Sequence, residues 1–234
     1  MSKTDGDDRE QKILDAATKL FLHYGFDKTT VSDIAREAGI SKGAIYLHFS
    51  SKEALLEALL AREMMAYTAH WLALLDADPH GGTIGGMYKN SLYALSHSAF
   101  MAAMFRQDGR ILGNYLRKPD NFFMQMRNSR EESERAVFVR MMQEAGVMRW
   151  DVDPGVVAHV MDMLAFGLVG MDDFIPPEKT PPLTELIEGI ATIMDRALTP
   201  DDVDNEKGKA IVRQIADAGR LQFEAAQKEN DDNR

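Results

Sequence analysis

Apolar residues recur along almost the whole chain at the spacing of α-helices, and the strict alternation of a β-strand is nearly absent. The first apolar stripe ends at Gly25, a residue type that commonly terminates a helix. It consists of Ile13, Leu14, Ala17, Leu20, Phe21 and Tyr24. The pattern therefore predicts an all-α protein whose first helix buries this stripe.

Two short helices are predicted next. Thr30 with Asp33 forms a capping arrangement for a helix that Gly39 ends, and Ser41 caps a third helix. The apolar positions of these two helices are Val31, Ile34, Ala35 and Ala38, then Ile45, Tyr46 and Phe49. Two short helices joined by a turn and packed on a preceding helix form a helix-turn-helix, which binds DNA.

The second short helix has the residue types that entry into the major groove requires. Gly43 and Ala44 are small, so the backbone can approach the base edges, and Lys42 can donate to a guanine. Glycine at position 39 suits the sharp turn because it adopts the left-handed conformation without steric cost. Three further side chains can reach phosphate oxygens beside the groove: Tyr46, His48 and Lys52.

Residues 29–55, TTVSDIAREAGISKGAIYLHFSSKEAL, resemble the DNA-binding signature of the TetR family of bacterial transcriptional regulators. With the first helix included, the resemblance covers about residues 10–60. It implies an N-terminal helix-turn-helix domain followed by a helical domain that binds a ligand and forms a homodimer. The DNA-binding residues are then expected to be Thr30, Ser41, Lys42, Gly43, Ala44, Tyr46, His48 and Lys52.

Four of these side chains also have an ordinary structural interpretation. Taken alone, Lys42 and Lys52 are typical of a solvated surface, and Tyr46 with His48 is compatible with partial burial. The sequence Gly-Ile-Ser-Lys-Gly at 39–43 also matches the nucleophile elbow of hydrolases. That elbow follows a strand, whereas a helix is predicted here, so we reject the match.

The rest of the chain predicts a helical body. Ser50 with Glu53 is a capping box for a fourth helix that runs to about Leu75. Further helices are expected at 83–100, 101–107, 110–117, 119–145, 153–174, 182–198 and 208–229. The predicted domains are a disordered acidic N-terminus at 1–8, a helix-turn-helix domain at 9–54, a helical ligand-binding and dimerisation domain at 55–200, and a C-terminal amphipathic helical extension at 201–234.

Two of these helices are candidates for a subunit interface. The helix at 153–174 is apolar almost all round, and the helix at 182–198 has a broad apolar stripe. The resemblance implies that both pair with their two-fold mates in a homodimer. The alternative is that both are central core helices of a monomer.

A ligand pocket is expected in the body. Of the 15 methionines, 11 lie between Met87 and Met171, interleaved with aromatic residues, and such a lining adapts to varied apolar ligands. The predicted ligand-binding residues are Asn90, Tyr93, His97, Met101, Phe105, Tyr115, Phe123, Met126, Phe138 and Met142. The alternative for each one is an ordinary core position.

Composition limits the classes of function. Cysteine is absent, which excludes disulfides and thiolate metal sites, and 27 basic against 37 acidic residues give a net charge of −10. This balance argues against a broad nucleic-acid or membrane surface but not against a small local one. Residues 1–10 lack the apolar segment of a secretory signal, and His159 and Asp162 interrupt the most apolar stretch. We therefore expect a soluble, cytoplasmic protein.

Enzyme chemistry is poorly represented. The six histidines form no His-Glu-x-x-His motif, and no glycine-rich phosphate loop is present. His159 and Asp162 lie three residues apart on an apolar helix, which is more typical of a core pair than of a metal site. No catalytic residue, metal or cofactor is expected.

The sequence thus predicts a sequence-specific DNA-binding transcriptional regulator, by family default a repressor released from a palindromic operator by a small, largely apolar ligand. The alternative is a ligand-independent DNA-binding dimer that acts architecturally or through a protein partner.

Overall fold

The structure is a computed structural model that describes residues 3–128, 133–170 and 177–232. Every regular element in these ranges is helical, which confirms the predicted all-α class. The chain divides into two compact units. Unit 1 contains residues 1–64 and 98–130, and unit 2 contains residues 65–97 and 131–234.

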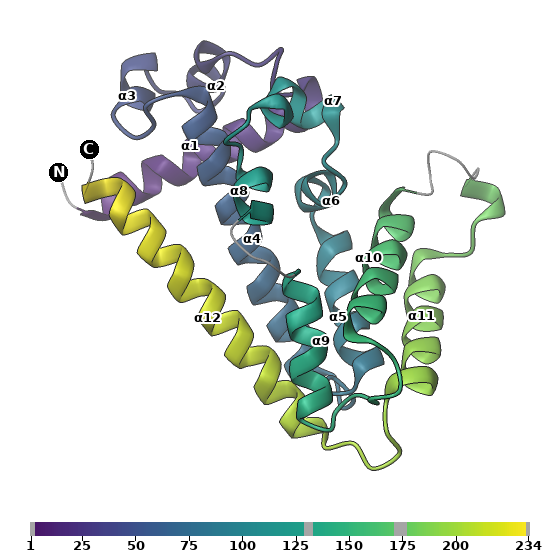
Figure 1. Ribbon diagram of the computed structural model, residues 1–234. Helices are drawn as coiled ribbons and strands as arrows, with labels where there is room; N and C mark the ends of the chain where they lie inside the picture. The colour runs from purple at the N-terminus through teal and green to yellow at the C-terminus, as the bar shows by residue number, and fades with distance from the viewer. Residues whose placement is uncertain (1–2, 129–132, 171–176, 233–234) are drawn as a thin grey trace. The chain divides into compact units, whose positions relative to one another are not determined.

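Unit 1 is built on the N-terminal helix α1 (Lys3–Tyr24). The helices α2 (Val31–Glu37) and α7 (Gly109–Leu112) pack against α1, as Figure 1 shows. The unit also contains α3 (Lys42–Tyr46), the first part of α4 (Lys52–Ala77), α6 (Ala99–Arg106), the 3₁₀ helix η1 (Gly113–Arg117) and α8 (Phe122–Asn128). Since α1 begins at Lys3, the structure is already helical within residues 1–8, which the sequence pattern predicted to be disordered.

The predicted core stripe of α1 is largely buried. Ile13, Ala17 and Phe21 are fully enclosed, but Tyr24 is 55% exposed and lies edge-on to His23 instead. The prediction for Tyr24 is therefore wrong. The helix ends at that residue and the chain turns away through Gly25, so the helical spacing no longer fixes which side is covered.

Unit 2 contains the remainder of α4 and five further α-helices in its described part. They are α5 (Ile84–His97), α9 (Glu134–Glu144), α10 (Pro154–Gly170), α11 (Leu183–Leu198) and α12 (Asn205–Asp232), with a 3₁₀ turn, η3 (Pro177–Lys179). Helix α5 packs along α11, and α10 packs along α9 (Figure 1). No described helix has the length and apolar character that a membrane span requires.

Helices α5 and α11 approach one another closely at the start of α5. A Cβ atom on Gly85 would lie 2.3 Å from the carbonyl oxygen of Ala191, so only glycine fits there. The Asp195 carboxylate accepts hydrogen bonds from the Gly85 N–H at 2.7 Å and the Thr83 hydroxyl at 3.1 Å. A side chain from α11 thus caps α5, which places α11 firmly within unit 2.

Helix α12, the predicted C-terminal extension, is also tied to unit 2. The Asn205 side chain accepts from the Gly82 N–H at 2.7 Å, and the Arg213 guanidinium lies 2.5 Å from the Asp76 carboxylate. Lys209 is buried beside the carbonyl oxygen of Asp76. The first half of α12 is therefore part of the packed unit.

A capping hydroxyl explains three differences from the predicted helix boundaries. The helix predicted at 83–100 ends at His97, since Ser98 caps α6 by accepting from the Met101 N–H. The helix predicted at 119–145 is divided into α8 and α9, with Ser133 capping α9. The first turn of α4 is capped by Ser51 rather than Ser50. A further difference is that the helix predicted at 110–117 is divided into α7 and η1 at Gly113, whose φ is +55°. Part of the predicted 153–174 helix, residues 171–174, lies outside the described residues.

Candidate nucleic-acid interface

The helix-turn-helix is fixed by local hydrogen bonds. Thr30 and Asp33 form a capping box at the start of α2, with the Thr30 Oγ1 accepting from the Asp33 N–H at 3.2 Å. At the other end, the Ile40 N–H donates to the Ala35 carbonyl at 2.9 Å across Gly39, whose φ is +68°. This pattern is a Schellman motif, which requires a left-handed residue and therefore favours glycine.

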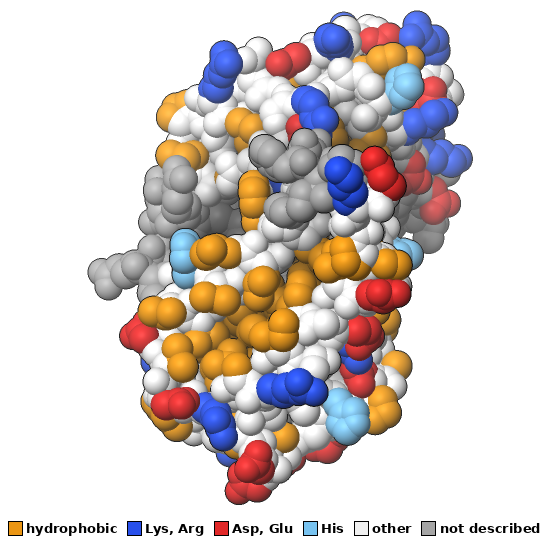
Figure 2. Space-filling view, turned by 90° about the vertical axis from the view of Figure 1, so that its right-hand side faces the viewer, with side chains coloured by type: hydrophobic (Ala, Val, Ile, Leu, Met, Phe, Trp, Pro, Cys, Tyr) orange, Lys and Arg blue, Asp and Glu red, His pale blue; other side chains and the backbone are white. Residues whose placement is uncertain are grey.

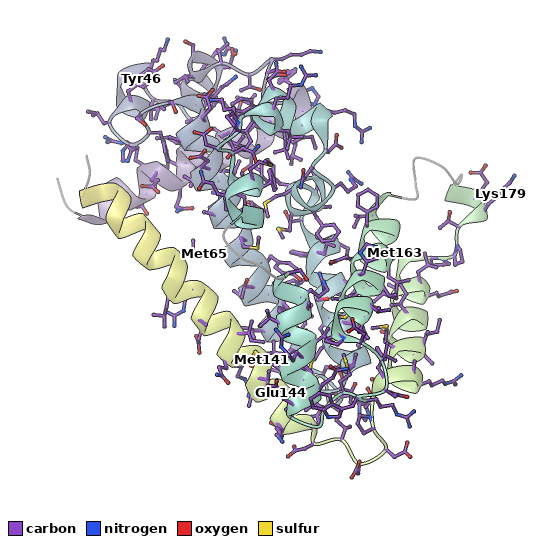
Figure 3. The ribbon with its side chains drawn as sticks, viewed as in Figure 1. Tyr46, Met65, Met141, Glu144, Met163 and Lys179 are labelled. Atoms are coloured by element: carbon purple, nitrogen blue, oxygen red, sulfur yellow. The ribbon has the colours of Figure 1, made fainter. Side chains whose placement is uncertain are left out.

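Helix α3 directs one face inward and leaves the other free. Helices α2 and α3 pack together, and Ile34 and Ile45 are both buried, Ile45 to 1% exposure. Lys42, Gly43 and Tyr46 are exposed, and Ala44 is half-buried. Figure 3 labels Tyr46 on α3. Of the three residues predicted to face the bases, Lys42 and Gly43 are therefore at the surface and Ala44 is partly covered, and a base contact from any of them remains a prediction.

Lys42 and Tyr46 act as a pair on this face. They lie one helical turn apart, and the Lys42 Nζ is 5.9 Å from the centre of the Tyr46 ring. Tyr46 was predicted both as an apolar core position and as a phosphate contact, but at 48% exposure it is not a core residue. Its ring supports the lysine side chain, and its hydroxyl remains at the surface.

The fold does not require glycine at position 43. A Cβ atom there would meet only the Ser41 Oγ, at 3.9 Å, which is an ordinary contact, and the backbone is not left-handed. By contrast, Gly39 has a positive φ that other residues adopt only with strain. Glycine 43 therefore leaves an open patch of backbone on the free face of α3.

The predicted hydroxyl contacts are also helix caps. The Thr30 hydroxyl donates to the Asp33 carboxylate at 2.6 Å, and the Ser41 Oγ accepts from the Ala44 N–H at 3.1 Å. The Ser41 hydroxyl only accepts in this hydrogen bond, so its proton can still be donated to a phosphate. The Thr30 hydroxyl proton is already donated to Asp33. The Thr30 hydrogen bond lowers the pKa of Asp33 because it stabilises the charged carboxylate.

His48 and Lys52 are placed differently from the expectation. His48 is half-buried, with its Nδ1 4.0 Å from the Glu10 carboxylate of α1. The Lys52 Nζ donates to the carbonyl oxygens of Phe26 at 2.7 Å and Thr29 at 3.0 Å. Both side chains are held within unit 1, and a phosphate contact from either one remains a prediction.

The predicted ligand-binding residues divide between the two units. Met101, Phe105, Tyr115, Phe123 and Met126 belong to unit 1, and Asn90, Tyr93, His97, Phe138 and Met142 belong to unit 2. Met101, Tyr115, Asn90 and Met142 are buried, and Phe105, Phe123, Tyr93 and Phe138 are half-buried, while His97 is exposed. The side chain of Met126 lies outside the described residues.

The polar members of this set have separate partners. Asn90 donates to the Asp78 carboxylate at 3.0 Å, and the Tyr93 hydroxyl donates to Glu188 at 3.0 Å. The His97 ring lies 4.5 Å from the ring of His70 on α4. These three side chains of α5 thus contact three different parts of unit 2, and a shared cavity wall remains a prediction.

Tyr115 has a structural role in unit 1. Its hydroxyl donates to Glu57 at 3.0 Å and accepts from the Phe122 N–H at 2.8 Å. Burial raises the pKa of Tyr115, because the phenolate would lose its hydration. The hydroxyl therefore joins η1, α4 and the start of α8.

The predicted core pair of His159 and Asp162 is not formed. Asp162 accepts from the Arg135 Nε at 2.6 Å, and His159 is exposed. Arginine reaches the carboxylate from α9, the helix that packs along α10. Within the described residues, no group of three or more potential metal ligands is found.

An apolar surface covers parts of α10 and α11. Val156, Val160 and Met163 lie on one side of α10 at helical spacing and are exposed, as is Ile193 of α11 at 67%. Figure 2 shows hydrophobic side chains gathered on one face of the molecule, and Figure 3 labels Met163 on α10. Contiguous apolar surface of this kind is typical of a protein interface.

Comparison with known proteins identifies the N-terminal region. The family model for bacterial regulatory proteins of the tetR family matches residues 13–59, which contain α2, the turn and α3. The HTH-type transcriptional repressor KstR2 of Mycolicibacterium smegmatis is 29% identical over 153 residues, covering 64% of this chain and 72% of that protein. Residues 13–59 thus belong to the DNA-binding domain of the TetR family.

Two solved structures have a fold similar to that of this chain. KstR2 of Mycobacterium tuberculosis, described as a ketosteroid transcriptional regulator, has a TM-score of 0.55 at 21% identity and covers 82% of this chain and 96% of its own. FadR of Bacillus subtilis, in complex with stearoyl-CoA, has a TM-score of 0.57 at 17% identity, with coverages of 79% and 96%.

Two features of this candidate interface were not predicted from the sequence. Leu47 follows α3 directly and is exposed, although it was not included among the DNA-binding residues. The sequence could have indicated this through spacing. Leu47 lies four residues after Gly43 and two after Ile45, so on a helix it shares the face of Gly43 and lies opposite Ile45. The contact between Lys52 and Phe26 joins residues far apart in sequence, and no local pattern indicates it.

Proposed function

We propose that this chain is a repressor that binds a palindromic operator as a homodimer and leaves it when a small, largely apolar ligand binds. Lys42, Gly43 and Ala44 face the base edges in this proposal. Thr30, Ser41, Tyr46, His48 and Lys52 lie along the phosphates. The proposal includes no catalytic step, and a regulator of bacterial DNA acts in the cytoplasm.

The observation that carries the proposal is the open backbone at Gly43. An added Cβ atom would meet only ordinary contact within the chain, so packing does not explain the glycine. In the middle of a helix glycine lowers stability by about 0.5–1 kcal/mol relative to alanine. Gly43 is the second residue of α3, so the part of this cost that applies to it is smaller. A close approach of DNA bases to α3 accounts for a glycine that the fold does not need.

Gly43→Ala tests this argument. We expect the variant to unfold at the same or a higher temperature and to bind DNA more weakly by ~1–3 kcal/mol, because the methyl group is forced against a base edge. Gly219→Ala is the matched control, since a Cβ atom at Gly219 of α12 also meets nothing within 4 Å. Equal DNA affinity of both variants would refute a close approach at α3.

The phosphate contacts follow from the same placement. The Ser41 hydroxyl and the Tyr46 hydroxyl lie at opposite ends of α3, and both can donate without breaking a contact within unit 1. Lys42 contributes a charge beside them. In this proposal a small local surface with one lysine and two hydroxyl groups contacts each half-site, which a net charge of −10 over the whole chain does not exclude.

The apolar surface on α10 and α11 supports the homodimer. In a two-fold dimer the same surface of each subunit meets its copy, so one patch that complements itself is sufficient. The exposed side chains Val160, Met163 and Ile193 would then be buried. A dimer presents two recognition helices to successive major grooves, which explains why a palindromic operator is expected.

The ligand is expected to be largely apolar. Methionine and aromatic residues dominate the predicted lining, and the FadR structure of similar fold contains stearoyl-CoA. A ligand that binds one of two dimer conformations more tightly shifts the population toward it. In this proposal the conformation with ligand bound has recognition helices that no longer match the operator spacing.

A titration of the DNA complex with fatty acyl-CoA thioesters and steroids distinguishes the repressor from its alternative. The repressor proposal requires at least one of these compounds to reduce operator affinity and to raise the thermal stability of the free protein. If protein saturated with such a compound keeps its operator affinity, the ligand-independent dimer that acts architecturally or through a protein partner is favoured.

A further inference from the structure

The outward face of α3 is centred on two positions. Successive residues of a helix are rotated by about 100°, so the positions two before and two after Ile45 point almost opposite to it. Those positions are Gly43 and Leu47. Because Ile45 is buried to 1% exposure, Gly43 and Leu47 lie directly on the side that faces away from the domain.

Leu47 is highly exposed for an apolar residue. Its backbone is helical, with φ −74° and ψ −23°, so it continues the rotation of α3. It is 83% exposed, and among the described residues no other large hydrophobic side chain is as exposed. Its contribution to the hydrophobic core of unit 1 is therefore small, and packing within the chain does not explain a leucine there.

The surroundings of Leu47 restrict what it can contact. It follows Tyr46, which pairs with Lys42, and it lies one helical turn after the open backbone of Gly43. In the proposed DNA complex this face enters the major groove. The apolar group that base pairs present in that groove is the 5-methyl group of thymine.

We propose that Leu47 is a specificity-determining residue that contacts the 5-methyl group of a thymine in each operator half-site. The inference rests on the proposed function and adds one base preference to it. Gly43 lets the backbone approach, and Leu47 then fills the space beside the thymine methyl group. Lys42 donates to a neighbouring base on the same groove wall.

The test uses a duplex selected by the wild-type protein from a random library. Each thymine of one half-site is replaced in turn by deoxyuridine, which pairs identically and lacks only the 5-methyl group. Affinities are measured for the wild type, for Leu47→Ala and for Leu221→Ala. Leu221 is a matched control because it is an exposed leucine, at 59%, on α12.

For the wild type and for Leu221→Ala, we expect that replacing one particular thymine weakens binding about fourfold. This factor corresponds to the loss of one buried methyl group, ~0.8 kcal/mol. For Leu47→Ala, replacing the same thymine has no effect, since the methyl group has already lost its partner. Thermal unfolding of Leu47→Ala is expected to match the wild type, because the side chain is exposed.

Two results overturn the inference while leaving the proposed function intact. One is a selected half-site without any thymine whose methyl group matters, and the other is an equal loss in the wild type and in Leu47→Ala. Failure to select any duplex contradicts the proposed function itself. The two kinds of failure are therefore distinct.

Discussion

The ammonium group of Lys52 at the start of α4 lies 4.0 Å from the centre of the Phe26 ring and donates to the Phe26 carbonyl at 2.7 Å. A second hydrogen bond, to the Thr29 carbonyl, joins α4 to the loop that precedes α2. Burial lowers the pKa of Lys52, since the cation loses hydration. A side chain expected to bind phosphate thus also holds the loop that positions the helix-turn-helix.

Lys52→Ala is therefore expected to lower stability as well as DNA affinity. Two carbonyl groups lose a charged donor and the Phe26 ring loses its cation, which together cost ~1–3 kcal/mol. Chemical denaturation measures the change, with Lys28→Ala as the control because Lys28 is exposed in the same loop. If Lys52→Ala instead leaves stability unchanged and reduces the slope of log DNA affinity against log salt concentration by about one, the ammonium group contacts only a phosphate.

Lys42→Ala is expected to relax sequence preference. Lys42 is exposed on the free face of α3, and loss of a good base contact costs ~1–3 kcal/mol on the selected site. Competition between the selected duplex and random DNA measures this preference. Lys12→Ala, an exposed lysine change on α1, serves as the control. Equal losses on selected and random DNA would show that Lys42 binds only the backbone.

Asp33→Asn tests the capping box through its pH dependence. The Thr30 hydrogen bond lowers the pKa of Asp33 in the folded state, so its stabilising effect is complete above the unfolded pKa. The effect is lost as the pH falls through the lower, folded pKa. We expect the wild type to melt at a higher temperature than Asp33→Asn at pH 6. The difference between the two melting temperatures should decrease as the pH is lowered from 6 to about 2.

The matched control for that series is Asp201→Asn, an exposed aspartate change in unit 2. Its melting temperature should remain parallel to that of the wild type over the same pH range. A difference between Asp33→Asn and the wild type that stays constant into acid would mean that the negative charge of the Asp33 carboxylate does not contribute to stability.

Ile193→Glu is expected to disrupt the proposed dimer. The side chain is 67% exposed on α11, so a charge there is tolerated by the subunit but is costly when buried against a second copy. Sedimentation velocity should show a dimer for the wild type and a monomer for the variant. Leu221→Glu makes the same kind of change on α12 and should remain dimeric. A dimer in Ile193→Glu would place the interface elsewhere.

Local signals in the sequence predicted the helix-turn-helix well. The capping box of Thr30 and Asp33, the turn at Gly39 and the cap at Ser41 depend on residues within a few positions of each other. Such interactions are readable because their geometry follows from spacing alone. The apolar period also placed Ile45 correctly in the core.

Interactions between distant residues could not be predicted in the same way. Asp195 caps α5 from α11, and Arg135 reaches Asp162 from another helix, both across long sequence separations. Predicted helix boundaries were wrong where a serine caps a new helix, as Ser133 does for α9. Ser133 lies in a polar stretch whose residues are equally compatible with one continuous helix, so the sequence did not indicate the boundary. Helical periodicity gives the covered face of a helix but not the partner that covers it.

Selection of binding sites from a random duplex library tests the central claim most directly. The wild-type protein is used beside Tyr46→Ala, at low and at moderate salt. The account predicts that the wild type recovers one two-fold symmetric site and that Tyr46→Ala recovers it weakly or not at all. Recovery of no common sequence by the wild type at either salt concentration would contradict the claim that α3 reads DNA.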